Sequence, residues 1–183
     1  IDAVDVYSCF PSAVQVAARE LGLPLDDPAR PLTVTGGLTF AGGPWNNYVS
    51  HSIATMAEKL AANPGQVGLI TANGGYLTKH SFGVYSTTPP AGEFHWDDVQ
   101  SEVDAEPTVV AEDGWAGTGT VETWTTPVNR AGEPEKVFLA IRTPSGSRAL
   151  AVITDPAQAE ASTREDIAGA KVTVAPDGTS GLD

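Results

Sequence analysis

Residues 36–44 read Gly-Gly-Leu-Thr-Phe-Ala-Gly-Gly-Pro and lead directly into a run with helical periodicity. The run predicts a helix over residues 46–62, with Asn46 or Asn47 as its N-cap. Its predicted apolar stripe consists of Val49, Ile53, Met56 and Leu60. A glycine-rich turn before a helix gathers backbone N–H groups at the positive end of the helix dipole, which suits a phosphate or a developing oxyanion. No Gly-Lys-Ser/Thr sequence follows, so the stretch is not a P-loop, and a tight strand-to-helix connection is the alternative interpretation.

The sequence on either side of this stretch predicts alternating strands and helices. Strands are expected at residues 1–7, 32–35, 67–72 and 76–85. A first helix begins at Pro11, where the missing N–H costs nothing, and ends before Gly22. Asn73-Gly74-Gly75 predicts a tight turn, so the last strand returns antiparallel. The order β-α-β-α-β-β predicts an α/β fold with a mainly parallel layer that ends in a hairpin.

The charge is distributed unevenly along the chain. The 183 residues include 10 basic and 23 acidic residues, for a net charge of −13. Residues 1–90 hold 6 acidic and 4 basic residues (net −2), whereas residues 91–183 hold 17 and 6 (net −11). Together with the proline-rich segment 86–92, this asymmetry predicts two domains, residues 1–88 and residues 89–183. So acidic a chain repels phosphate, which disfavours nucleic acid as a partner.

The second domain has the sequence pattern of an all-β unit. Strands are predicted at residues 120–125, 136–142, 148–153 and 166–174. An acidic helical turn is expected near residues 156–165. Short strands separated by turns predict a small barrel of a six-stranded type. Because such barrels often bind other molecules, a protein or nucleic-acid interaction module is a weaker alternative function for this domain.

The composition excludes several classes of protein. Cys9 is the single cysteine, so the chain has neither a disulfide framework nor a cysteine-rich zinc site. His51, His80 and His95 show no ligand spacing, and we expect no metal. No apolar run approaches about 18 residues, so no membrane span is predicted and we expect a cytoplasmic protein. The sequence starts at Ile1 without a signal peptide, and we expect either a processed chain or a piece of a longer protein.

Three stretches, taken in order, resemble active-site loops of the thiolase superfamily. They are Tyr7-Ser8-Cys9-Phe10, Gly42-Gly43-Pro44 and Ala72-Asn73-Gly74-Gly75. The family's loops read Asn-Glu-Ala-Phe or His-Asp-Cys-Phe, then Gly-His-Pro, then Cys-x-Gly. The likeness covers about residues 1–86. It is closest to the type 1 thiolase-like proteins of actinobacteria, named acetyl-CoA acetyltransferases, which are similar to the sterol-carrier-protein-linked thiolases.

This resemblance implies more than the residues alone indicate. It implies a partial thiolase fold in the first domain, followed by the family's additional C-terminal barrel, which is similar to an oligonucleotide/oligosaccharide-binding (OB) fold. A coenzyme A thioester is the implied ligand, and no cofactor is expected to be bound covalently. The N-terminal thiolase half is expected either in the same chain or in a partner subunit, so the chain is expected to be a C-terminal fragment or a natural half-protein.

The departures from the family's pattern concern the residues that carry the reaction. A thiolase needs a nucleophilic cysteine, a second cysteine as acid and base, and donors for an oxyanion. The family's Gly-His-Pro histidine aligns with Gly43, and its acid/base cysteine aligns with Ala72, so neither position can move a proton. Gly74 matches the glycine whose N–H helps to form an oxyanion hole. The nucleophile belongs to the N-terminal half, so the resemblance implies an acyl-CoA-handling protein of this acyltransferase family without standard thiolase chemistry.

Tyr7 is the candidate catalytic side chain, because it stands where the family has Asn or His. Some thiolase-like aldolases use Tyr at such sites, which implies retro-aldol cleavage of an acyl-CoA as the alternative function. A strand-end tyrosine with its hydroxyl in water is the other interpretation. Cys9 aligns with a packing position and is expected to be buried and inert. Tyr76, just after the Ala72 loop, is either a second candidate phenol or a core aromatic. Trp45 is expected to fill the acyl pocket or to pack on its helix, and His51 to be solvated or at an interface.

Overall fold

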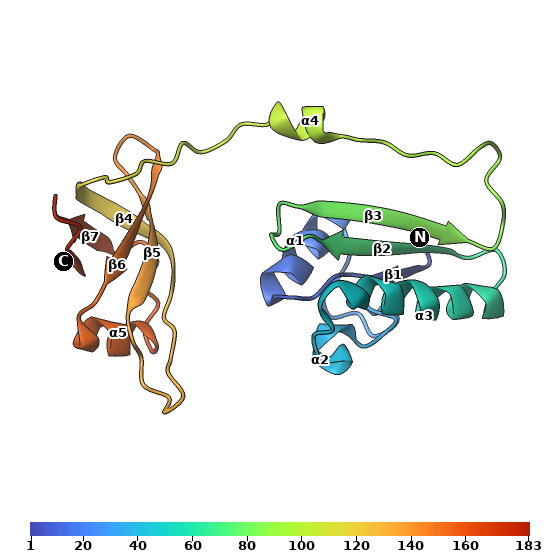
Figure 1. The fold of residues 1–183 in the computed structure, drawn as a ribbon, viewed down its shortest axis with the longest axis horizontal. Coiled ribbons are helices and arrows are strands. Elements are labelled where there is room, and N and C mark those ends of the chain that lie inside the picture. Colours follow the sequence, from blue (N-terminus) through green and yellow to red (C-terminus); the bar gives the residue numbers. More distant parts are fainter. The chain divides into compact units, whose positions relative to one another are not determined.

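The computed structural model describes all 183 residues, which divide into two compact units, Ile1–Trp96 and Asp97–Asp183 (Figure 1). Each unit has its own sheet and its own hydrophobic core. None of the helices combines the length and the apolar character that a membrane crossing requires.

Unit 1 is built on a three-stranded sheet in the order β1-β2-β3. β1 (Ala3–Asp5) runs parallel to β2 (Val67–Asn73), and β3 (His80–Ser86) returns antiparallel to β2. The closing hairpin is therefore confirmed, but the layer is not mainly parallel, because it contains one parallel and one antiparallel pair. The turn is longer than predicted, because β3 begins only at His80 and the Gly74 N–H donates to the Lys79 carbonyl at 2.8 Å.

Two helices cover the two faces of this sheet. α1 (Pro11–Leu21) begins at its proline and ends at Gly22, which has the left-handed conformation (φ 65°) as predicted. α3 (Tyr48–Ala62) follows a short 3-10 turn, η1 (Trp45–Asn47). Val4 packs in the cluster that contains α1 residues, and its neighbour Ala3 packs in the cluster of α3. Since successive strand residues point to opposite faces, the two helices lie on opposite sides.

The buried side of α3 differs from the predicted stripe in its first half. The buried residues of the helix are Tyr48, Ser52, Met56 and Leu60. Ile53, predicted in the core, is 36% exposed. The helix is rotated in this way because the hydroxyl groups of Tyr48 and Ser52 both donate to the buried carboxylate of Asp5.

Residues 32–35 do not form the predicted strand. Their donors are used elsewhere, because the N–H groups of Val34 and Thr35 both point to the Asp5 carboxylate. A segment whose N–H groups bind one side chain cannot pair along a strand, so the sheet contains a single parallel pair. The glycine-rich stretch that follows is also not a plain connection, since it contains the five-residue helix α2 (Gly37–Ala41).

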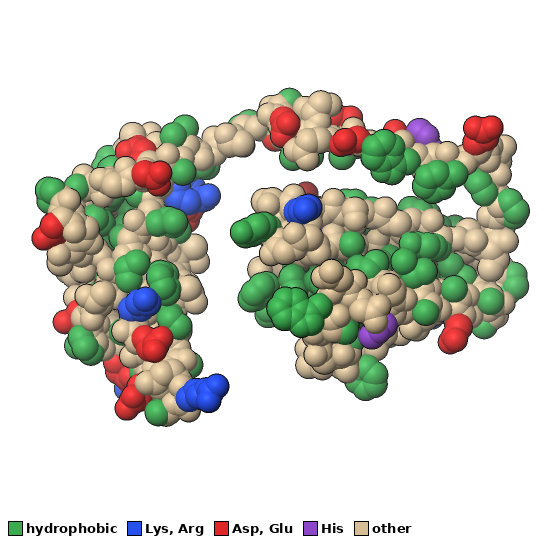
Figure 2. All heavy atoms as spheres, in the orientation of Figure 1, with side chains coloured by type: hydrophobic (Ala, Val, Ile, Leu, Met, Phe, Trp, Pro, Cys, Tyr) green, Lys and Arg blue, Asp and Glu red, His purple; other side chains and the backbone are tan.

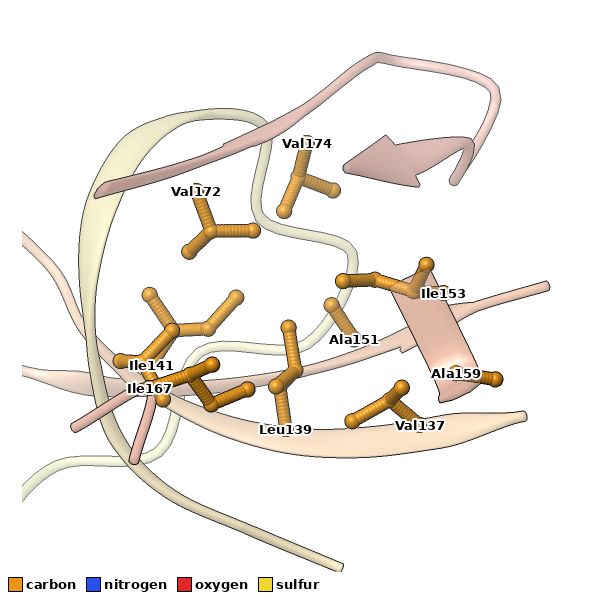
Figure 3. Packing of buried hydrophobic residues seen from close by; sticks show 10 residues of the cluster. Val137, Leu139, Ile141, Ala151, Ile153, Ala159, Ile167, Val172 and Val174 are labelled. Atoms are coloured by element: carbon orange, nitrogen blue, oxygen red, sulfur yellow. The ribbon is translucent and has the colours of Figure 1, made fainter. Parts of the chain in front are cut away.

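Unit 2 contains a five-stranded antiparallel sheet in the order β6-β5-β4-β7-β8. Its strands are β4 (Gly117–Thr125), β5 (Val137–Arg142), β6 (Arg148–Ile153), β7 (Lys171–Val174) and β8 (Ser180–Leu182). Two short helices, α4 (Gln100–Asp104) and α5 (Pro156–Ser162), accompany them. Figure 3 shows the buried aliphatic side chains of β5, β6 and β7 gathered with Ala159 of α5 and Ile167.

The sheet of unit 2 is open, so the closed barrel predicted from the short strands is not found and its OB-like character is not confirmed. β6 and β8 are the two edge strands, and no ladder joins them. One side-chain bond links the edges, from Ser180 Oγ to the Val152 carbonyl at 2.9 Å. Five strands are present rather than six, and the last predicted strand is shortened to β7 because residues 166–170 form a turn.

Candidate functional site

The first two of the three loops singled out in the sequence line one hollow in unit 1, and the third reaches it through a side chain. The hollow has a volume of about 350 Å³, and its lining residues are Tyr7, Cys9, Leu38, Gly43 and Trp45. Asn73, from the third loop, donates its side-chain amide to Cys9 Sγ at 3.5 Å. Residues widely separated in the sequence thus contribute to one small surface.

A larger hollow, of about 430 Å³, lies beside β1 and α3 and is lined by Arg30 and Lys59 among others. It contains none of the residues predicted for the site. We therefore take the smaller hollow as the candidate site, because the loop residues singled out in the sequence line it and size alone does not select a ligand site.

Tyr7 is held at the end of β1 by two contacts. Its N–H donates to Oγ1 of the buried Thr71 at 3.0 Å, and its ring meets the Tyr48 ring edge-on, with centroids 5.2 Å apart and an interplanar angle of 87°. Its hydroxyl makes no hydrogen bond within the chain. The ring is therefore fixed while the phenol oxygen stays available to a ligand.

Cys9 is exposed, so the prediction of a buried packing thiol is wrong. The residue lies in the bend between β1 and α1, outside both elements. Its sulfur consequently reaches the hollow rather than the contact between strand and helix. The chain thus presents an exposed thiol in the same lining as Tyr7.

Gly43 and Ala72, the two positions predicted to align with thiolase catalytic residues, lie in different surroundings. Gly43 borders the hollow with φ 66°, and no atom lies within 4 Å of the place its Cβ would take, so the space beside it is open. Ala72 lies in β2 opposite Ser81 and does not line the hollow. The N–H of Gly74 is engaged in the hairpin turn by Lys79, so in this structure it is not free for an oxyanion.

The aromatic side chains of these loops are more exposed than the sequence predicts. Tyr76, expected in the core, is 77% exposed, and Trp45 is 88% exposed with an unusual φ of 52°. Figure 2 shows hydrophobic side chains gathered on the visible face of unit 1. His51 is exposed, as one of its two interpretations requires, and its ring contacts the Asn47 amide at 3.0 Å. Asn47, the observed N-cap residue, makes no capping bond and has helical backbone angles (φ −91°, ψ −8°) rather than the extended ones typical of a cap.

The sequence analysis missed the residue that holds the site together, Asp5. Its side chain is fully buried, and its carboxylate accepts six hydrogen bonds. Oδ1 accepts from Tyr48 Oη at 2.9 Å and from Ser52 Oγ at 2.6 Å. Oδ2 accepts from the loop, where Thr33 Oγ1 lies at 2.8 Å and the Val34 N–H at 2.9 Å. The available signal was an acid placed between two apolar residues, Val4 and Val6, in the strand predicted at the start of the chain.

Burial changes the acidity of Tyr48 beside this carboxylate. Desolvation is the main cause that raises the pKa of the Tyr48 phenol, and the negative charge of Asp5 adds to it, while the hydrogen bond with Thr35 acts in the opposite direction. Tyr48 therefore stays a neutral hydrogen-bond donor toward Asp5 across the physiological range.

The hollow itself is poor in ionisable groups. Its lining offers a phenol and a thiol but no imidazole, carboxylate or ammonium group. No group of three or more His, Cys, Asp or Glu side chains gathers anywhere in the chain to hold a metal ion. The arrangement can donate a hydrogen bond from the phenol and surround an apolar group.

Unit 2 has a charged cluster of a different kind. Glu122 binds two guanidinium groups, with Arg148 Nε at 2.6 Å and Arg142 as the second partner. The hydrogen bond from Arg148 is the largest cause that lowers the pKa of Glu122 from its ordinary value of 4.5 to about 2. All three side chains are partly exposed. We interpret the cluster as a surface ion-pair network that supports the sheet.

The comparisons with known proteins agree with this fold and this set of loops. Residues 98–179 match the family model of the thiolase-like protein type 1 additional C-terminal domain. Among solved structures, the chain is similar to the crystal structure of a monomeric SCP2-thiolase like protein type 1 from Mycobacterium smegmatis, with 37% sequence identity and a TM-score of 0.85. The similarity covers 100% of this chain and 40% of that chain. A search of curated proteins gave no match.

The fold and the loops thus define a thiolase-like protein, and the resemblance seen in the sequence is confirmed. The chain belongs to the type 1 thiolase-like proteins and corresponds to their C-terminal part, including the additional domain. It spans less than half the length of the solved relative.

Proposed function

We propose that the protein containing this chain binds an acyl-CoA thioester and that the hollow of unit 1 receives the acyl end of this ligand. The observation that carries the proposal is the meeting of the first two loops at the hollow, with Asn73 of the third loop on the Cys9 sulfur. In the thiolase family the corresponding loops form the active site. The remaining walls are proposed to come from the N-terminal thiolase half, which the solved relative is long enough to contain.

The same residues argue against standard thiolase chemistry. Carbon–carbon bond formation next to a thioester requires a group that removes and returns a proton. Gly43 and Ala72 carry no such group, and the Gly74 N–H is already bonded to Lys79. The proposal is therefore acyl-CoA binding without thiolysis or Claisen condensation.

Alkylation of Cys9 tests the binding proposal directly. With the full-length protein, we expect saturating decanoyl-CoA to slow the reaction of Cys9 with iodoacetamide at least fivefold, as followed by peptide mass spectrometry. Free decanoate is the ligand control. Unchanged labelling with decanoyl-CoA would refute binding at this hollow.

Two exposed aromatic residues provide a matched pair of variants for this experiment. Trp45 lines the hollow, whereas Tyr76 is similarly exposed but does not line it. We expect Trp45→Ala to lose most of the protection by decanoyl-CoA and Tyr76→Ala to keep it. Equal losses in the two variants would place the ligand elsewhere on unit 1.

A second candidate function rests on the free hydroxyl of Tyr7. In a retro-aldol reaction, a base, proposed to come from the N-terminal half, removes the proton of the β-hydroxyl of a β-hydroxyacyl-CoA. The bond between the α and β carbons then breaks, the β carbon leaves as an aldehyde or ketone, and the electron pair of the broken bond forms an enolate. A phenol at the hollow would hydrogen-bond the enolate oxygen or return the proton to the α carbon. Tyr7→Phe decides between the two functions when 3-hydroxydecanoyl-CoA is the substrate. Cleavage lost with binding retained favours the lyase, and no cleavage by either protein favours the binder.

A further inference from the structure

We propose that Asp5 is a positioning residue for the hollow, whose buried carboxylate sets the position of the glycine-rich segment opposite Tyr7 and Cys9. The proposal rests on the proposed function in one respect, since the ligand that benefits from this geometry is the acyl-CoA. The geometry itself is independent of which ligand binds.

Neutral hydrogen-bond donors, and no ion pair, stabilise the charge of Asp5. The side chain is fully buried and makes no ion pair, so its charge is stabilised only by neutral donors. A buried carboxylate is costly unless such donors surround it, and the cost rises for every donor that moves away. The helix α3 supplies the donors of Oδ1, and residues 33–35 supply all the donors of Oδ2. The loop therefore cannot shift without exposing one oxygen of a buried charge.

Two threonine hydroxyls connect the Asp5 carboxylate to the backbone of the glycine-rich segment. Thr33 Oγ1 donates to Asp5 and accepts from the Gly36 N–H at 3.0 Å. Thr35 Oγ1 in the same way donates to Asp5 and accepts from the Gly37 N–H at 3.1 Å. Both glycines have left-handed backbone angles, with φ of 93° and 81°. The two threonine hydroxyls thus fix a backbone course that glycine alone leaves free.

Leu38 and Tyr48 connect this hydrogen-bond network to the lining of the hollow. Leu38, which follows directly, donates its N–H to Ser8 Oγ at 2.9 Å, and its side chain lines the hollow. On the other side of the carboxylate, Tyr48 donates its hydroxyl proton to Asp5, and its ring contacts Tyr7 edge-on. Asp5 therefore acts on both walls of the hollow, although it touches neither the space nor a ligand.

The experiment compares hydroxyl deletions on the two sides of the carboxylate. Thr35→Val removes a hydroxyl on the loop side, Ser52→Ala removes one on the helix side, and Asp5→Asn removes the charge with little change in shape. The rate of Cys9 alkylation by iodoacetamide, followed by peptide mass spectrometry, reports on the hollow without any ligand. Circular dichroism and thermal unfolding establish that each full-length variant is folded.

We expect Asp5→Asn and Thr35→Val to change the alkylation rate of Cys9 at least fivefold and to reduce protection by decanoyl-CoA at least tenfold. Ser52→Ala is expected to stay within twofold of the wild type in both readouts. If Ser52→Ala and Thr35→Val change the rate equally, or if neither Asp5→Asn nor Thr35→Val changes it, Asp5 has no positioning role. A wild-type protein without protection by decanoyl-CoA would refute the proposed function, while the rates without ligand would still decide the role of Asp5.

Discussion

Each unit contains one carboxylate that accepts several strong hydrogen bonds, and the two are stabilised in opposite ways. Asp5 in unit 1 is fully buried and accepts only from hydroxyl and backbone N–H groups. Glu122 in unit 2 is partly exposed and is bound by the guanidinium groups of Arg142 and Arg148. The first arrangement depends on donors fixed by the backbone, and the second depends on flexible cations in contact with water.

The two arrangements have different consequences for the structure of their units. Neutral donors stabilise a buried charge only in one geometry, so Asp5 specifies the course of the loop that borders the hollow. Ion pairs at a surface tolerate movement and are weakened by salt, so Glu122 adds stability without fixing a backbone path. A site for a ligand is better built on the first arrangement, because it keeps its shape when the solvent changes.

The largest expected effect is that of Asp5→Ala on unit 1. The substitution leaves six donors without their acceptor, several of them buried, and we expect the free energy of unfolding of unit 1 to fall by about 4 kcal/mol. Urea titration monitored by circular dichroism measures the loss. A loss below about 1 kcal/mol would contradict the central position of Asp5.

A smaller effect is expected for Tyr48→Phe, which removes one donor to Asp5 and keeps the ring against Tyr7. We expect a loss of about 1.5 kcal/mol, since the deleted bond was made to a charged acceptor. The variant should also lose the part of the alkaline destabilisation that arises because burial raises the pKa of this phenol. Unfolding measured between pH 9 and about 11.5 compares the two proteins. An unchanged alkaline profile would assign that destabilisation to other groups.

Glu122→Gln tests the contribution of the ion pairs to the stability of unit 2. Because the pKa of Glu122 is lowered from 4.5 to about 2 in the folded state, its stabilisation is present above pH 4.5 and is lost as the pH falls toward 2. Solvent around the partly exposed arginines screens the pair, so we expect a loss of only about 1 kcal/mol at pH 7. Unfolding of unit 2 followed by tryptophan fluorescence should show a flatter acid profile in the variant. A parallel acid profile would mean that other carboxylates cause the acid loss.

The smallest effect distinguishes the two carboxylates by salt alone. Raising sodium chloride to about 1 M should remove roughly 0.5 kcal/mol of the Glu122 contribution and leave that of Asp5 unchanged. The measurement is the difference between wild type and each variant, Glu122→Gln and Asp5→Asn, at low and high salt. Equal salt dependence of the two contributions would contradict the conclusion that Asp5 and Glu122 are stabilised in different ways.

Local sequence signals predicted the elements that depend on neighbouring residues. Pro11 and Gly22 bound α1 as expected, because a proline at the first turn and a left-handed glycine act through their own backbone angles. The hairpin of β2 and β3 was also predictable, although its turn is longer. The order of the three loops in the sequence indicated the family before any coordinates did.

The errors concern groups whose partners are distant in the chain. The strand predicted at residues 32–35 gives way to a loop because its donors turn to Asp5, which is 28 to 30 residues away. Cys9 is exposed because its bend faces the hollow, and no local pattern states which way a bend faces. The barrel of unit 2 stays open because strand pairing at the edges depends on all five strands together.

The family, the uneven distribution of charge and the absence of proton-moving groups at positions 43 and 72 follow from the identity and order of the residues. The coordinates were needed to see that donors from two separate segments surround Asp5, that the Gly74 N–H is already used, and that Tyr7 and Cys9 line one hollow. The physical reason is that a hydrogen bond is satisfied by proximity in space, and the donors of Asp5 lie up to 47 residues from it along the chain.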